Sequence, residues 1–587
     1  MHTPLDHEFV RAAARAADRS AAPLAAGPDE EPAGVAHRGL ARRVKTLIAA
    51  YRSPDSALHG SGQAVAAAMT HLRALRATQT ATGLFAGGDN VQSPPDSAFT
   101  VNDVCDAHVL AAGAGPELRE VTAALADIAG AATPGLLTGG VHTPNHRWEL
   151  SSALARLHRS FPDDRLLARV EEWLAEGVDI DVEGLYSERS ANYAAHVSNP
   201  SLLLLADVLD RPDLRDAVER NLTATLDLIR PDGTVETVHS RRQDQNQPFP
   251  LAPYLAHYRL LAIRTGRGDL SRAAHWAAAG GIDDPDLLAE TILTPDLCRE
   301  LPTQTPELLP RAHYIPTARL ASRASTTAHS VLYGGSDVPA FRRIRSGLAC
   351  NPTFLRLFAG DAVLDAVRLA QGFFDLGPFR AAHMEQLADN RYRLTETLSA
   401  PYYQPLPPDL RQPDGAYYVA DEGRFSAAMA FPDRPQDVVS RTTRVDVELR
   451  EDGADLRIDI SGPRVPWALE LTLRPGGVIE GGDPLDDGRW CLRAGPLTYR
   501  VGDDEIRVEA TVEAGEPLAG PDRSDVLRYD PGQDYTMVGG TDATTGNRVY
   551  IGGNGPQTLS VALRADRFRT RLPTSTIRGM AISGMKG

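Results

Sequence analysis

The first half of the chain has hydrophobic residues at helical spacing. Between residues 36 and 300 apolar residues recur three and four positions apart, as in "HRGLARRVKTLIAAYRS", "RWELSSALARLHRSF" and "DRLLARVEEWLAEG". Gly, Pro or Asp separates these segments, and the connections between them have hairpin length. Serial helix hairpins of this kind predict an α/α toroid or a solenoid of helix pairs.

The second half alternates apolar and polar residues. After about residue 325, short β-rich runs such as "RTTRVDVELREDGADLRIDISG" and "WALELTLRPGGVIEG" are separated by DG, PGG, GDD and GNGP turns. This pattern predicts an antiparallel β-sandwich. We therefore predict a multidomain α+β protein with a flexible lead-in over residues 1–35, an α/α toroid over 36–320 and a β-sandwich over 325–587.

Composition narrows the possible partners. The net charge is −16, whereas nucleic-acid binding relies on clustered Lys and Arg, so we expect no nucleic-acid partner. Charges interrupt the N-terminal stretch and no apolar run approaches ~18 residues, so neither a signal peptide nor a membrane span is expected. The four cysteines lie far apart without a CxxC pair, which indicates no zinc site and no disulfide framework. A cytoplasmic location without cofactor or metal fits these features, and a homo-oligomer remains open.

Four polar loop clusters recur about once per predicted hairpin. They are "GGDNVQSPPDSAFTVND", "TPNHRWE", "EGLYSERSANY" and "DGTVETVHSRRQDQNQ". A toroid gathers its loops at one end, so we expect each cluster to form one wall of a single cleft.

The cluster "TPNHRWEL", residues 143–150, stands at a predicted helix start. Asn145 is a favoured cap, and a capping role alone would explain it. His146 and Glu149 are three positions apart on one helix face near the N-terminus, where an anion such as a carboxylate is stabilised. Trp148 is placed to stack on a sugar ring, although packing in the helical core is the commoner role for such a residue. The role of Arg147 stays undecided.

Two further clusters carry many hydrogen-bonding side chains. One holds Tyr186, Glu188, Arg189, Asn192, Tyr193 and His196 just before an apolar helix; the other holds Glu236, His239, Arg241, Arg242, Gln243, Asp244, Gln245 and Asn246. This composition suits the binding of sugar hydroxyls and carboxylates. The alternatives are a solvated loop and tyrosines that pack in the core with the hydroxyl bonded at its edge.

The order of these features resembles the heparinase II/III-type polysaccharide lyases and their alginate-lyase relatives. A helical half precedes a β-sandwich, "NH" opens one helix, and an acidic-Gly turn is followed by a Tyr 47 residues after His146. The resemblance implies a lyase that cleaves a 4-linked uronic-acid glycan, an anionic oligo- or polysaccharide, by β-elimination. It implies that Asn145 and His146 hold and neutralise the uronate carboxylate and that Tyr193 transfers protons, with Tyr186 as the alternative.

One feature of that family is missing. Its members usually supply another His, in a His-x-His-like setting, from the start of the β-domain. Here His329 and His383 are weak candidates, and His239 on the third cluster is the expected replacement. The residues predicted to contact substrate are Asp89, Asn90, Arg147, Trp148, Glu149, Tyr186, Glu188, Arg189, Asn192, Arg241, Arg242 and Gln245.

The chemistry of β-elimination explains these residue types. The C5 proton of a uronate becomes acidic when neighbouring donors or cations stabilise the developing enolate. A tyrosine, with an ordinary pKa near ~10, serves as a base when positive charge stabilises its phenolate. Arg189, His196, His239 and Arg241 are possible sources of that charge.

Two other functions stay open. An inverting glycoside hydrolase would use a pair of separated carboxylates. Candidates for such a pair are Asp89, Asp96, Glu183, Glu188 and Asp232. A carbohydrate-binding protein that kept the toroid without catalysis is the second alternative.

Overall fold

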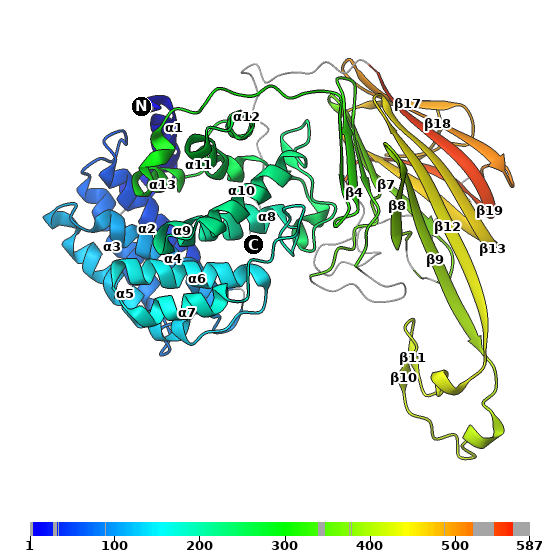
Figure 1. Cartoon of the computed structure of the whole chain (residues 1–587), viewed down its shortest axis with the longest axis horizontal. Coiled ribbons are helices and arrows are strands. Elements are labelled where there is room, and N and C mark those ends of the chain that lie inside the picture. Colours follow the sequence, from blue (N-terminus) through cyan, green and yellow to red (C-terminus); the bar gives the residue numbers. More distant parts are fainter. Residues whose placement is uncertain are drawn as a thin grey trace.

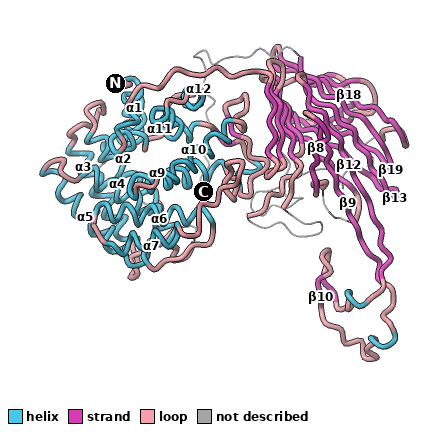
Figure 2. The backbone as a smooth tube through the Cα atoms, in the orientation of Figure 1, coloured by secondary structure: helices cyan, strands magenta, loops and turns pink. Residues whose placement is uncertain are grey.

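A computed structural model describes residues 4–27, 32, 34–88, 90–337, 347–374, 376, 378–486, 488–519 and 545–566. A helical domain and a β-domain lie side by side (Figure 1), with nearly all helices in the first and the large sheet in the second (Figure 2). The last segment of the helical domain, the 3₁₀ turn η5, spans Pro295–Cys298, and the first strand of the β-domain, β3, begins at Arg311. The multidomain α+β class predicted from the hydrophobic pattern is confirmed.

The helical domain has inner and outer helices. The inner helices α2 (His37–Arg52), α4 (Pro94–Ala111), α6 (Pro144–Ser160) and α9 (Asn199–Leu209) pack each against the next. The outer helices α3 (Gly62–Ala77), α5 (Arg119–Leu137), α7 (Asp164–Leu174) and α10 (Pro212–Leu226) cover them. Helices α11 (Leu255–Thr265), α12 (Gly268–Ala277) and α13 (Leu287–Leu293) complete the domain. Inner α4 is buried around most of its circumference, whereas outer α5 buries one stripe, as expected of a toroid.

The inner helices begin at the same end of the domain. Each is followed by an outer helix that runs back, so the first turns of α2, α4 and α6 lie together. This end contacts the β-domain: Arg189 Nη2 donates to the carbonyl of Thr317 at 2.7 Å, and Arg241 Nε pairs with Asp337 at 2.7 Å. The polar clusters predicted to form one cleft are therefore next to the domain junction.

The N-terminus differs from the prediction of a flexible lead-in. Helix α1 (His7–Ala26) is capped by Asp6, whose side chain accepts from the backbone N–H of Phe9 at 3.0 Å. Phe9, Ala13 and Ala17 are buried, and the helix packs against α2, α3 and α13. The alanine-rich face has little hydrophobicity per residue but permits close helix contact, so the composition of this segment did not indicate a core helix.

The β-domain is built from strands that pair antiparallel, except for the short β16, which pairs parallel with β19. They are β3 (Arg311–Ile315), β4 (Leu320–Ala324), β5 (His329–Tyr333), β6 (Leu355–Ala359), β7 (Ala362–Gln371), β8 (His383–Ala388), β9 (Arg391–Tyr403), β12 (Gln436–Arg450), β13 (Gly453–Leu473), β14 (Val478–Glu480), β15 (Asp483–Asp486), β16 (Arg489–Cys491), β17 (Pro496–Val501), β18 (Asp504–Ala514) and β19 (Asn547–Asp566). Strands β4–β7 face β12, β17 and β18 across an apolar core, which makes two layers.

Two strands belong to both layers. The first half of β13 pairs with β12, its second half pairs with β7, and β19 pairs along both halves. The register shifts between Ile460 and Val465, where Gly462 adopts a φ of 120°. An irregularity of this kind bends a strand, which lets β13 pass from one layer to the other.

No helix among the described residues is long and apolar enough to cross a membrane.

Candidate active site

Four side chains from three separate segments of the chain form a continuous hydrogen-bonded network. Asn145 Nδ2 donates to Glu188 Oε2 at 2.6 Å, and the other Glu188 oxygen accepts from Arg242 Nη1 at 2.7 Å. Arg242 Nη2 donates to the Tyr193 hydroxyl at 3.1 Å. The fold therefore brings together the clusters around residues 145, 188 and 242, as expected if they share one site.

Tyr193 is held at an irregular helix start. It ends the short helix α8 (Ala191–Tyr193), which continues through a π-helical turn, η2 (Ala194–Ser198), into α9. Ser190 caps α8 by accepting from the Tyr193 N–H at 3.1 Å, and its hydroxyl donates to Asp244 at 3.0 Å. π-Helical turns occur often at functional sites, because they reposition a side chain relative to a regular helix.

Arg242 is the cation that contacts Tyr193. Its guanidinium lies over the phenol ring, 4.5 Å from the ring centroid, while Nη2 bonds the hydroxyl. The same guanidinium pairs with Glu188, which is buried. Burial raises the pKa of the Glu188 carboxyl, although its bonds to Asn145 and Arg242 act in the opposite direction.

His146 lies beside the network as a neutral imidazole. Its ring packs edge-on against His142, with centroids 4.7 Å apart, and near Phe99 at 6.5 Å. Burial, reinforced by the positive charge of neighbouring groups, lowers the pKa of His146 to about 4, so it carries no charge at neutral pH. His146 Nδ1 and Asn145 Oδ1 are buried without a hydrogen-bond partner among the described residues, so both have unused hydrogen-bonding capacity.

Arg38 is close to this site and was not predicted from the sequence. Its guanidinium lies 4.2 Å from the Phe99 ring centroid and pairs with Asp96. Asn90 also bonds Asp96, through its backbone N–H at 3.0 Å and its side chain at 3.2 Å. The sequence signal was the position of Arg38 in the first turn of an inner helix, the same place that Asn145 has on α6. Asp89 lies outside the described residues.

Two aromatic residues predicted to contact substrate belong to the core instead. Trp148 is fully buried and its Nε1 donates to Asp179 at 3.0 Å, so it packs in the helical core and the predicted sugar contact is wrong. Tyr186 is buried, and its hydroxyl donates to Asn199 at 2.9 Å. Burial raises the pKa of the Tyr186 phenol, which makes it unsuitable as a base. Of the two tyrosines, Tyr193 is the one whose hydroxyl contacts the network.

The side chains of Arg147 and Glu149 contact neighbouring residues of the helical domain. Arg147 lies over the Trp148 ring at 4.6 Å and pairs with Glu176 at 2.9 Å. Glu149 is buried and accepts from Asn102 Nδ2 at 2.5 Å. Burial raises the pKa of Glu149 to about 7. The structure shows neither side chain bonded to the four-residue network.

His239 does not supply the positive charge expected of it. It is buried, and burial lowers the pKa of its imidazole to about 4, so it is neutral at neutral pH. Of the other histidines, His329 is buried against Phe358, His383 is exposed at the start of β8, and His196 is exposed beside Phe249. Arg242 is the cation at Tyr193.

The remaining predicted residues hold the site loops in place. Arg189 and Arg241 form the junction contacts given above, and Gln245 Oε1 accepts from the backbone N–H of Cys350 at 3.0 Å. The backbone N–H of Asn192 donates to Asp244 at 3.2 Å. The contacts of Arg189, Arg241 and Gln245 tie the loops of the toroid to the β-domain, and that of Asn192 joins two toroid loops.

Most of the carboxylates considered for a hydrolase form ion pairs with arginines. Asp96 pairs with Arg38, and Glu188 pairs with Arg242. Asp232 pairs with Arg474 of the β-domain at 3.0 Å. Glu183 is partly exposed in a turn. Of these, Glu188 is the one with a raised pKa, as a general acid requires.

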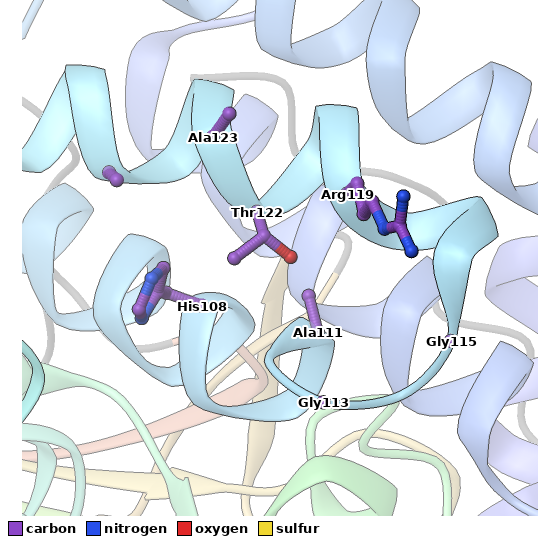
Figure 3. Close-up of a pocket in the computed structure, with 8 residues that line it drawn as sticks. His108, Ala111, Gly113, Gly115, Arg119, Thr122 and Ala123 are labelled. Atoms are coloured by element: carbon purple, nitrogen blue, oxygen red, sulfur yellow. The ribbon is translucent and has the colours of Figure 1, made fainter.

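A separate hollow lies at the opposite end of α4. It has a volume of about 330 Å³ and is lined by His108, Ala111, Gly113, Gly115, Arg119, Thr122, Ala123 and Ala126 (Figure 3). His108 follows Asp96 by twelve residues, which corresponds to roughly 18 Å along a helix. The hollow is therefore separate from the network around Tyr193.

The described residues contain no group of three or more His, Cys, Asp or Glu side chains placed to hold a metal ion.

Comparison with known proteins relates the fold to polysaccharide lyases. The sequence matches no family model and no curated protein. A chondroitin AC lyase of Streptomyces coelicolor A3, solved with chondroitin sulphate, is similar at a TM-score of 0.55 and 13% identity, over 97% of this chain and 81% of that one. Heparinase III is similar at 0.54 and 10%, over 92% and 79%. A Paenibacillus xanthan lyase is similar at 0.53 and 11%, over 96% and 57%.

At these identities the likeness establishes the fold. The chain has the toroid-and-sandwich fold of these polysaccharide lyases, which is the fold that the family resemblance predicted.

Proposed function

We propose that this protein is a polysaccharide lyase that cleaves a 4-linked, uronic-acid-containing glycan by β-elimination. The observation that supports the proposal most directly is the contact of Arg242 with Tyr193. A cation 3.1 Å from the hydroxyl and 4.5 Å from the ring centroid is positioned to stabilise negative charge that develops on the Tyr193 oxygen during proton transfer. A phenolate is the base that C5 proton abstraction needs.

We assign the uronate carboxylate to His146 and Asn145, which both stand in the first turn of α6, where the helix favours negative charge. The buried Nδ1 of His146 has no partner among the described residues and can serve as the donor, whereas Asn145 can donate only through Nδ2, which bonds Glu188 in the free protein. His146 is neutral in the free protein, so it acts first as a hydrogen-bond donor; a bound carboxylate would then favour its protonated form. Either contact stabilises the enolate that develops when the C5 proton leaves.

The proton and electron movements balance with one tyrosine. The Tyr193 phenolate takes the C5 proton, the C5–H electron pair forms the C4–C5 double bond, and the C4–O bond breaks. The leaving glycosidic oxygen then takes the proton from the Tyr193 phenol, which restores the phenolate. Arg242 stabilises the charged form at the beginning and at the end of this cycle.

The test is a lyase assay with wild type and Tyr193→Phe across a panel of uronate oligosaccharides. The wild type should produce new ultraviolet absorbance from the unsaturated uronic ring, and Tyr193→Phe should remove it. Tyr186→Phe is the matched control, because it deletes a buried phenol hydroxyl that bonds Asn199 outside the network. It should retain activity.

Cleavage without absorbance would contradict the lyase proposal. If Glu188→Gln then abolished cleavage while Tyr193→Phe did not, the hydrolase alternative would be favoured, since the raised pKa of Glu188 suits a general acid. Saturable binding without any product would favour the carbohydrate-binding alternative.

A further inference from the structure

The Asp244 carboxylate accepts hydrogen bonds from two segments that are far apart in the sequence. Asp244 lies in the 3₁₀ turn η3 (Gln243–Asn246). Its Oδ2 accepts from the Ser190 hydroxyl at 3.0 Å and from the backbone N–H of Asn192 at 3.2 Å. Its Oδ1 accepts from the Ser240 hydroxyl at 2.5 Å. Each carboxylate oxygen therefore serves a different segment of the chain.

Each of the two serines also accepts from a backbone N–H of the candidate site. Ser190 Oγ accepts from the Tyr193 N–H at 3.1 Å, and Ser240 Oγ accepts from the Arg242 N–H at 3.1 Å. A hydroxyl has one hydrogen to donate, and in both serines Asp244 accepts it, so the lone pairs of the oxygen are left for these N–H groups. Asp244 thereby holds the two backbone positions from which the Tyr193 and Arg242 side chains project.

We propose that Asp244 is a positioning residue that sets the contact between Arg242 and Tyr193. The inference rests on the proposed function, in which Arg242 stabilises charge that develops on the Tyr193 oxygen. The contact is 3.1 Å long and joins side chains from separate segments, so it depends on how those segments are held relative to each other. A displacement of about 1 Å between reacting groups can lower a rate about 100-fold.

Other bonds between the two segments act on Glu188 instead. The backbone N–H of Arg241 donates to the carbonyl of Glu188 at 2.9 Å, and Arg241 Nη1 donates to that of Ser187 at 2.8 Å. Both acceptors lie ahead of α8 in the chain. These bonds fix Glu188, whereas the bonds of Asp244 fix the helix start that carries Tyr193.

Two substitutions of Asp244 remove its bonds to different extents. Asp244→Ala deletes both acceptor oxygens, so both segments lose their partner. Asp244→Asn keeps the size and shape of the side chain but has one acceptor oxygen and an NH₂ group that only donates. One of the two segments must then lose its bond. Asp244→Asn therefore carries the test if Asp244→Ala does not fold.

Hydrogen exchange tests the positioning without a catalytic readout. A segment that loses hydrogen bonds opens more often, so its amides exchange faster. In Asp244→Ala, peptides that cover residues 189–198 and 238–247 should both exchange faster than in the wild type, while the rest of the helical domain is unchanged. In Asp244→Asn at least one of the two should do so. Faster exchange in neither segment of Asp244→Ala, or in only one of them, would overturn the inference.

Kinetics tests whether the held contact matters for the reaction. Asp244→Ala and Asp244→Asn should lower kcat roughly 10- to 100-fold and change KM by less than about threefold, because Asn145 and His146 keep their positions. Ser190→Ala should give part of this loss and add nothing to it in the double variant with Asp244→Ala, because the two residues act as a unit. A kcat of Asp244→Ala within about threefold of wild type, or losses that multiply in the double variant, would contradict the proposed role.

Ser61→Ala is the matched control for a purely structural effect. Ser61 also caps a helix, α3, by accepting from the backbone N–H of Ala64 at 3.3 Å. Its loss should lower the melting temperature as Ser190→Ala does, while kcat stays at the wild-type value. An equal fall of kcat in both serine variants would mean that any lost cap has this effect, and the inference would fail. If the wild type forms no unsaturated product, the proposed function fails, and the exchange experiment alone decides whether Asp244 holds the two segments.

Discussion

Replacing Arg242 with Met is the perturbation that best tests the proposed chemistry. Arg242 is the residue that joins Glu188 to Tyr193, with contacts of 2.7 and 3.1 Å. Methionine keeps much of the side-chain volume and removes the charge and all the N–H donors. The phenolate then loses its cation, and the buried Glu188 loses its ion-pair partner. We expect a large fall in kcat with a smaller change in KM.

The size of the effect follows from the distances. A charge pair about 4 Å apart at an effective dielectric constant of ~20 is worth about 4 kcal/mol. Glu188 shares the guanidinium and offsets part of its field, which leaves roughly 2–3 kcal/mol for the phenolate. Because each 1.36 kcal/mol is about a tenfold change in rate, kcat should fall roughly 30- to 150-fold. Arg242→Lys keeps the charge but cannot bond both Glu188 and Tyr193, so its kcat should lie between those of wild type and Arg242→Met.

The assay is the rate of unsaturated-product absorbance as a function of pH. The deficit of Arg242→Met should lie in kcat, because the lost cation acts on the charge that develops on the Tyr193 oxygen during proton transfer. Arg241→Met is the control, since Arg241 pairs with Asp337 and not with Tyr193. Arg242→Met with kcat within about threefold of wild type would refute the assignment of Arg242 as the cation that stabilises charge on Tyr193.

Three further predictions concern the helix that begins at Pro144. Asn145→Ala should lower kcat/KM about 100-fold, the scale of losing one enolate-stabilising donor, with an unchanged circular dichroism spectrum; an activity near that of wild type would contradict its role. Trp148→Ala should reduce the free energy of unfolding by about 3–5 kcal/mol in chemical denaturation, since the side chain is fully buried. Burial raises the pKa of Glu149 from 4.5 to about 7, so the folded state holds this proton more tightly than the unfolded state and stability falls as pH rises through that range. Glu149→Gln should therefore raise the free energy of unfolding relative to wild type at pH ~8, by up to about 3 kcal/mol, and leave it nearly unchanged at pH ~4.5.

Much of the fold was predictable because periodicity is local. Helical spacing in "RWELSSALARLHRSF" and alternation in "RTTRVDVELREDGADLRIDISG" identify the face of each element that is buried, independent of its neighbours. Helix α1 was not predicted, because its buried residues Ala13 and Ala17 give only a weak hydrophobic pattern along the chain. Their burial depends on close contact with other helices.

The sequence by itself determined which residue types are available: an amide and an imidazole at one helix start, a tyrosine and a carboxylate in the next cluster, and arginines in a third. Tertiary structure decided which of them meet. Arg242, and not His239, contacts Tyr193, and Trp148 turns into the core although it adjoins Asn145 and His146. The physical reason is that hydrogen-bond distances and the burial that shifts a pKa depend on how segments far apart in the chain pack together, whereas the pattern along the chain reports only on each segment alone.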